Sequence, residues 1–226
     1  MKTSSILNIL PQLALAAALT ALIGCASNNY EKGAVTSTSI DDAANKIGTG
    51  KAKIAAVLTS LNDLVNVTQG DLVPKYTQFK TAVSDLQSTA KDVSDRVVDM
   101  RTKGNEYFNA WDQQLALIKN EDIKSRSTER KNTVQKEFTD IQKSYTEVQI
   151  SFQPFMSNLK DIQTALDSDL TMQGIASIKP AAETANQNGV KLEASVEKLD
   201  AEFRDLGVAM STSAPAPAGT TNAPPQ

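Results

Sequence analysis

The sequence predicts an all-α protein: an elongated antiparallel four-helix bundle with a protruding two-helix coiled-coil hairpin. Two observations support this fold class. Apolar residues recur in alternating steps of three and four over two long segments, 76–111 and 134–166, as in helices that bury a narrow stripe against partners. Hydrophobic residues make up 40% of the 226 residues but aromatic residues only 5%, and this balance favours long helices over a sheet.

The two apolar stripes define the middle helices of the predicted bundle. The first consists of Tyr76, Phe79, Val83, Leu86, Ala90, Val93, Val97, Met100, Gly104, Tyr107 and Trp111. The second consists of Val134, Phe138, Ile141, Tyr145, Val148, Phe152, Phe155, Leu159, Ile162 and Leu166. Four aromatic residues of the second stripe could line a ligand cavity, but their spacing is that of core positions, and we interpret them as core: Phe138, Tyr145, Phe152 and Phe155.

The N-terminal segment 1–24 is typical of a secretory signal peptide. Lys2 precedes a mostly apolar run that is too short to span a bilayer comfortably. The run ends in Leu22-Ile23-Gly24-Cys25, which resembles the bacterial lipobox. This resemblance implies cleavage before Cys25 and acylation of Cys25, with palmitate among the chains, so that a lipid anchor joins the mature protein to a membrane. An ordinary signal peptide followed by a chance cysteine is the alternative.

The anchor also predicts a location. An Asp after the lipidated cysteine would resemble the signal that retains lipoproteins at the inner membrane, and this chain has Ala26 there. We therefore expect a lipoprotein of the outer membrane that faces the periplasm, in a Gram-negative cell envelope.

The remainder divides into a tether, a helical domain and a tail. Residues 25–38 are small and polar and predict a flexible tether, and 39–208 carry the helical pattern. We expect helices over about 39–67, 71–119, 122–167 and 175–206, and Pro180 places the start of the regular part of the last helix near Ser177. A kink is expected at Pro154 because its ring leaves the carbonyl of Ile150 without a helical donor. The Ala/Pro/Ser/Thr-rich segment 209–226 cannot build a core and predicts a disordered tail.

The unequal helix lengths predict that the middle pair stands free from about Met100 to Val134, with its tip near Asn120. The candidate contact residues at this tip are Lys119, Lys124, Arg126, Arg130, Lys131 and, just below them, Trp111. An excess of basic residues there suits an acidic partner, anionic lipid head groups or peptidoglycan. The alternative is a solvated hairpin whose charges keep it soluble and whose Trp111 fills the seam.

Composition excludes several classes of function. The chain has no histidine and a single cysteine, so we expect no enzymatic activity, no metal site and no intrachain disulfide. The segment Gly48-Thr49-Gly50-Lys51 resembles the end of a phosphate-binding loop, but Asn45 and Ala52 break that motif and we expect no cofactor. A formal net charge of −3 without a basic stripe argues against nucleic-acid binding.

Residues from about 70 to 207 resemble a family of bacterial, often lipid-anchored helical proteins known as domain of unknown function 2959. The residues that carry the resemblance, in order, are Gly70-Asp71-Leu72, Tyr76, Val93-Ser94-Asp95-Arg96-Val97, Trp111, Ser125, Ser127, Arg130 and Pro154. The resemblance implies a helical envelope lipoprotein and supplies no activity. We therefore expect a structural or protein-interaction role, with an envelope protein or peptidoglycan as partner; the alternative is a protein that binds or shapes the membrane surface.

Overall fold

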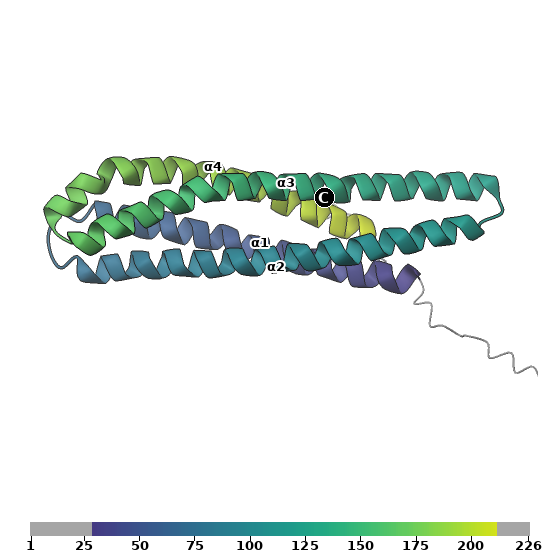
Figure 1. The fold of residues 1–226 in the computed structure, drawn as a ribbon, viewed down its shortest axis with the longest axis horizontal. Helices are drawn as coiled ribbons and strands as arrows, with labels where there is room; N and C mark the ends of the chain where they lie inside the picture. Colours follow the sequence, from purple (N-terminus) through teal and green to yellow (C-terminus); the bar gives the residue numbers. More distant parts are fainter. Residues whose placement is uncertain (1–28, 212–226) are drawn as a thin grey trace, which may run out of the picture.

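The computed structural model describes residues 29–211, which form four long helices joined by short turns. They are α1 (Asn29–Val65), α2 (Val73–Leu117), α3 (Glu121–Ser168) and α4 (Met172–Met210). Consecutive helices run antiparallel, and the described residues contain no strand (Figure 1). The predicted all-α bundle is therefore confirmed. The expected signal peptide, Cys25 and most of the predicted tail lie outside the described residues.

Local chemistry explains where the helices begin. The side-chain oxygen of Asn120 accepts hydrogen bonds from the backbone N–H groups of Asp122 and Ile123, both at 3.1 Å, and so caps α3. Thr171 caps α4 in the same way through the N–H of Gly174, at 3.1 Å. The turn before α2 contains Gly70 at φ +100°, a conformation that only glycine adopts without strain.

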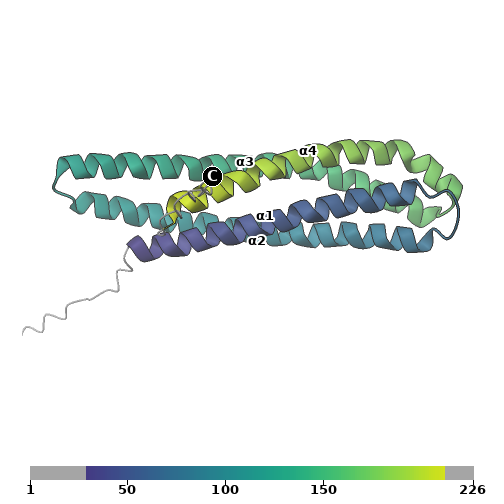
Figure 2. The ribbon, with the colours of Figure 1, turned by 180° about the vertical axis from the view of Figure 1, so that it is seen from behind.

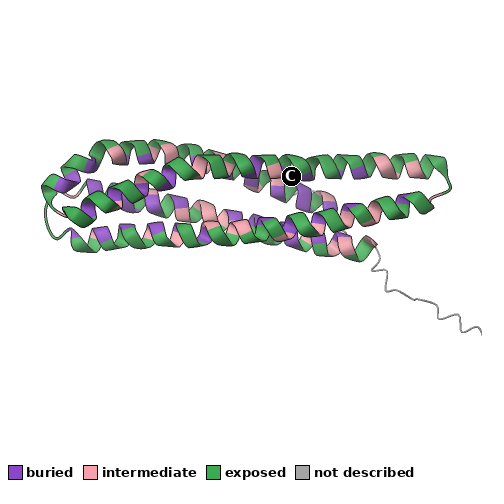
Figure 3. Cartoon of the chain, viewed as in Figure 1, coloured by how far each residue is buried: buried purple, intermediate pink, exposed green. Residues whose placement is uncertain are grey.

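The four helices pack in the spatial order α2, α1, α4, α3. The backbones of α1 and α2, of α1 and α4, and of α3 and α4 run close together, whereas those of α2 and α3 approach each other at few places. Two views from opposite sides show the same arrangement (Figures 1 and 2). The buried residues face the interior between the helices, and most of the outer surface is exposed (Figure 3). The bundle is thus closed on three sides and less tightly closed between α2 and α3.

Helix α1 begins ten residues earlier than the predicted Ser39, so the expected tether is helical from Asn29 onward. Its buried positions continue the three-and-four spacing through Gly33, Thr36, Ile40, Ala43 and Ile47. The hydroxyl of Thr36 donates to the carbonyl of Lys103 on α2, at 3.2 Å. Small and weakly polar residues fill the first turns of the seam, and therefore the apolar pattern does not reveal them.

Helix α4 is also longer than predicted at both ends. It begins at Met172 rather than at about Ile175, runs through Pro180, and continues beyond Gly207 to Met210. Gly207 does not end the helix because it is a point of close packing: a Cβ atom there would lie 2.8 Å from the Asp41 carboxylate on α1. Residues 209 and 210, assigned to the tail by the sequence, belong to this helix.

These longer outer helices shorten the protruding part of the middle pair. Gly33 of α1 packs against the Tyr107 ring, and the carbonyl of Ala209 on α4 accepts a hydrogen bond from Arg130, at 2.6 Å. The predicted free region, Met100 to Val134, is therefore too long. We call residues 108–129, which lie between these two contacts, the free hairpin. The turn between α2 and α3 extends past the ends of α1 and α4 (Figure 1).

Helix α3 is continuous through Pro154. Figure 1 shows a change of direction between its C-terminal part, in green, and its N-terminal part, in teal. A proline inside a helix removes one backbone hydrogen bond and bends the axis. The bend directs the C-terminal part of α3 at an angle to α2.

Gly104 allows α2 to pack against the Phe138 ring of α3, and a Cβ atom at this position would overlap that ring. Gly104→Ala should therefore destabilise the bundle by about 1–3 kcal/mol, the usual range for overpacking. Gly48→Ala is the matched control, because its Cβ would meet only the flexible end of Arg204, at 3.8 Å. The control should gain up to about 1 kcal/mol from helix propensity. Urea unfolding followed by circular dichroism measures both, and equal effects would contradict this packing.

Candidate functional site

The free hairpin has an aromatic base. Tyr107 lies 5.4 Å from Phe108 and 5.3 Å from Trp111, measured between ring centroids, and Phe108 meets Phe138 of α3 edge to face. The indole N–H of Trp111 donates to the hydroxyl of Ser127 on α3, at 3.2 Å. Trp111 therefore ties α2 to α3 and fills the seam, as one of the two sequence interpretations has it.

Three of the five predicted contact cations have partners within the bundle. Lys131 is buried and donates to Asp112 of α2 at 2.5 Å. Arg130 donates to the carbonyl of Ala209, which attaches the last turn of α4 to the hairpin. The guanidinium of Arg126 pairs with Asp122 one turn earlier on the same helix, at 3.1 Å. The first two contacts are structural links between helices.

Tyr107 lies where three of the helices meet. Its ring packs on Gly33 of α1. Burial raises the pKa of its phenol, and the nearby Arg130 opposes this rise. The phenol therefore stays neutral at physiological pH, beside a guanidinium whose position is set by α4.

The tip of the hairpin differs from its base. The side chains of Lys119 and Lys124 form no hydrogen bond or ion pair with any residue that the structure describes. Two large aliphatic side chains close to them in sequence are also in solvent, Leu117 with 70% and Ile123 with 55% of its surface exposed. We call Leu117, Lys119, Ile123 and Lys124 the tip patch. The apolar half of this patch was missed because neither aliphatic residue lies on a heptad stripe.

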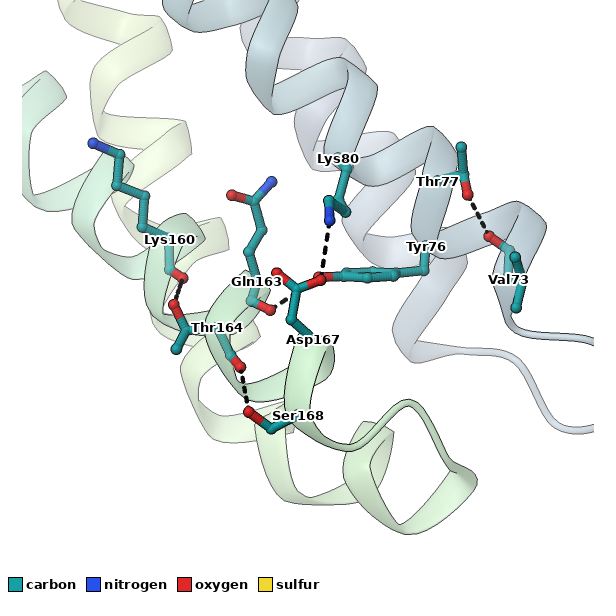
Figure 4. A network of polar contacts seen from close by, with 9 residues as sticks. All are labelled: Val73, Tyr76, Thr77, Lys80, Lys160, Gln163, Thr164, Asp167 and Ser168. Carbon is teal, nitrogen blue, oxygen red and sulfur yellow. Dashed lines mark hydrogen bonds and ion pairs between the residues drawn. The ribbon is translucent and has the colours of Figure 1, made fainter.

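The opposite end of the bundle has a polar link between α2 and α3 (Figure 4). The Tyr76 ring is buried, and its hydroxyl donates to the Asp167 carboxylate at 2.8 Å and to the Gln163 carbonyl at 2.9 Å. Lys80 donates to the same carboxylate oxygen at 3.0 Å, and its ammonium lies 5.3 Å from the Tyr76 ring centroid. This network fixes the start of α2 against the end of α3.

The network changes the acidity of its members. The hydrogen bond from Tyr76, and next that from Lys80, lowers the pKa of Asp167. Burial of Tyr76, aided by the hydrogen bond to Asp167, raises the pKa of its phenol well above the usual range. Tyr76 therefore stays protonated and Asp167 ionised at neutral pH, so that both hydrogen bonds persist.

Other kinds of site find little support in the described part of the chain. No group of three His, Cys, Asp or Glu side chains among residues 29–211 is arranged to hold a metal ion. None of the described helices combines the length and the apolar character needed to cross a membrane. The most distinctive surface features of these residues are the tip patch and a cleft between α2 and α3.

These features define an elongated helical-bundle protein with a projecting hairpin. The model of the family described as "Protein of unknown function (DUF2959)" matches residues 27–205, and the chain therefore belongs to this family. The predicted family is thus confirmed. No curated protein and no solved structure matches the chain.

Asp167 gives a prediction for acid stability. Because its pKa is lower in the folded state than in the unfolded chain, near 3.9, its stabilisation is complete above that value and is lost as pH falls through the folded pKa. Asp167→Asn should therefore lower the free energy of unfolding at pH 7, and the difference from the unsubstituted protein should shrink towards pH 2. Asp161→Asn, an exposed acid of the same helix, is the control. Urea titrations at four pH values measure the free energy of unfolding of each protein. A difference between Asp167→Asn and the unsubstituted protein that does not change with pH would contradict this role of Asp167.

Proposed function

We propose that this protein is a lipid-anchored protein of the cell envelope, with a structural or protein-interaction role and no enzymatic activity. Acyl chains on Cys25 hold it in the outer membrane, and its bundle faces the periplasm. The observation that supports this most is the short distance in sequence between Cys25 and Asn29, where a long, continuous helix begins. An anchored Cys25 therefore constrains the position of the bundle closely.

The geometry of such an anchored bundle follows from simple lengths. Asn29 is four residue steps along the chain from Cys25, and a segment of that length reaches about 14 Å at most. The 48 residues of α3 span about 72 Å. The end with the 66–72 and 169–171 turns is then held away from the membrane, where peptidoglycan or an envelope protein would meet it. We propose that the protein acts as a rigid spacer between the membrane and such a partner.

A second function, contact with the membrane surface, is supported by the tip patch. The N-terminus of α1 lies towards the hairpin end of the bundle (Figures 1 and 2). Ten residues of α2 separate Tyr107 from Leu117, so the tip extends about 15 Å past the Tyr107 level. This length is close to the reach of the tether, and the tip would therefore face the membrane that holds the anchor. Exposed Leu117 and Ile123 suit shallow insertion between head groups, and Lys119 and Lys124 suit anionic lipids.

The anchor is tested by replacing its cysteine. Cys25→Ala should move the protein from the membrane pellet to the soluble periplasmic fraction, because the bundle then has no acyl chain to hold it. Fractionation of cells, followed by immunoblotting, measures this shift. Ser27→Ala leaves the cysteine intact and should stay in the pellet. A Cys25→Ala protein that still pellets with membranes would rule out the anchor as the means of attachment.

Membrane contact is tested on the full chain with Cys25→Ala, so that no acyl chain contributes. It should sediment with vesicles of anionic phosphatidylglycerol and be released by high salt. The added pair Leu117→Asp and Ile123→Asp should reduce binding at least tenfold, because it removes the apolar contact and adds two negative charges. Val98→Asp, at an exposed valine of α2 away from the tip, should bind normally. Absence of binding by the parent protein would dismiss this second function and leave the spacer role untouched.

A further inference from the structure

A cleft opens into the bundle between α2 and α3. It has a volume of about 300 Å³, and residues from all four helices line it. Its inner surface is apolar and includes the buried side chains of Ile54, Leu86, Leu192 and Leu199. Pockets that bind small molecules in helical bundles have this position, size and lining.

The cleft interrupts the heptad seams of both middle helices. Four seam positions lie half-exposed along its sides: Ala90 and Val93 on α2, and Val148 and Phe152 on α3. The seam positions on either side along both helices are buried, for example Leu86 and Val97 on α2. Of the four aromatic residues of the second stripe, Phe138, Tyr145 and Phe155 are buried in the core, and Phe152 is partly buried and packs against it. Tyr145 and Phe152 also line the cleft, so Phe152 is both a core contact and a cleft wall.

Links between α2 and α3 lie on both sides of the cleft. Tyr76 and Lys80 hold Asp167 at one end, and Asp112 holds Lys131 at the other. Between these links, no hydrogen bond or ion pair among residues 29–211 joins the two helices directly. The cleft is therefore part of a braced framework, and a ligand would find it already formed.

Short side chains prevent the cleft from closing. Ala90 occupies a seam position where the neighbouring heptads have the larger Val83 and Val97. Gly50 of α1 faces Val93 with no side chain of its own. Contact between water and apolar surface is unfavourable, and a half-open apolar cleft therefore favours an apolar ligand over water.

The rim of the cleft identifies the polar part of that occupant. Exposed residues at the rim are Gln87, Lys91, Gln149 and Gln153. One basic and no acidic residue lines the cleft, although the chain has more acidic than basic residues overall. Lys91 pairs with Asp95 at 2.7 Å, but both side chains are well exposed, and such pairs are weak enough to exchange partners. The amide N–H groups and this ammonium suit a carboxylate head group.

We propose that the α2–α3 cleft binds a fatty acid, with its alkyl chain between the helices and its carboxylate at the rim beside Lys91. The lining runs along α2 from Leu86 to Ser94, about 12 Å, and along α3 from Tyr145 to Gln153 for the same length. A groove parallel to the helices fits a linear chain better than a compact ring system. This site is separate from the anchor at Cys25 and from the tip patch.

Photocrosslinking of a fatty acid tests the proposal. The full chain in phosphatidylcholine vesicles is mixed with palmitic acid that has a diazirine in its alkyl chain, irradiated and digested. Mass spectrometry should find the label on peptides that contain 86–94 and 145–153. The phospholipid of the vesicles is in excess and competes with the probe for any lipid site. Labelling of the cleft peptides under these conditions therefore indicates a site for the free fatty acid rather than for phospholipid. Labelling spread evenly over the helices, or confined to the tip, would overturn the proposal.

Three variants refine this experiment. Ala90→Phe fills the cleft and should lower labelling at least tenfold, whereas Val98→Phe, on an exposed face of the same helix, should leave it unchanged. Circular dichroism and thermal unfolding establish that each variant is folded. If Ala90→Phe does not fold, the proposal is tested with Lys91→Glu instead, since this substitution changes only the exposed rim of the cleft.

Lys91→Glu also tests the head group. Unlabelled palmitate should compete with the probe about tenfold less well in this variant, because a carboxylate then meets a like charge. Hexadecanol, which has the same chain and no charge, should compete equally in the variant and in the unsubstituted protein. Equal losses for both competitors, or no loss for palmitate, would show that Lys91 does not bind a carboxylate.

Discussion

The packing of α1 against α4 is the contact on which the bundle depends. Each of these helices also packs closely on its neighbour in the chain, α1 on α2 and α4 on α3, while α2 and α3 have little backbone contact. The α1–α4 interface therefore joins two helical hairpins that would otherwise meet only at scattered points. It is built on close approaches: a Cβ atom at Gly189 would press on Leu58 and Phe155, and one at Gly207 on Asp41. Substitutions that widen this interface would separate the two hairpins and remove the floor of the cleft.

Heptad spacing was enough to predict the four antiparallel helices, and a set of residues between 70 and 207 was enough to predict the family. The same spacing failed where side chains are small. Gly33 and Thr36 hold seam positions in the first turns of α1, but neither has the hydrophobicity that makes a stripe visible in the sequence. The error then spread to the free hairpin, because its length was deduced from the length of α1 and α4. A glycine that allows close packing inside a helix, as Gly207 does, cannot be told from a helix-ending glycine by rules based on propensity and capping.

The candidate sites were harder to predict than the fold. A count of charges near Asn120 finds the basic residues of the hairpin but does not reveal that Lys131 meets Asp112 and that Arg130 meets Ala209, because these partners lie on other helices. The cleft could not be predicted from the sequence for a different reason. A heptad specifies which face of a helix is apolar. The distance between two facing helices depends instead on side-chain volume and on helix bending. Phe152 occupies the same kind of position as Phe155, and only the three-dimensional arrangement separates a cleft wall from a core residue.

The packing order of the helices has a consequence for folding. Contacts within the α1–α2 and α3–α4 pairs join helices that are consecutive along the chain, whereas those between α1 and α4 join residues much farther apart in sequence, such as Asp41 and Gly207. Local contacts form with a small loss of chain entropy, and distant ones require the intervening chain to be ordered. The two hairpins are thus natural early folding units, and their docking through α1 and α4 is the late event. Because α2 and α3 contribute little to that docking, the cooperativity of the whole molecule depends on a single interface that includes neither of the two longest helices.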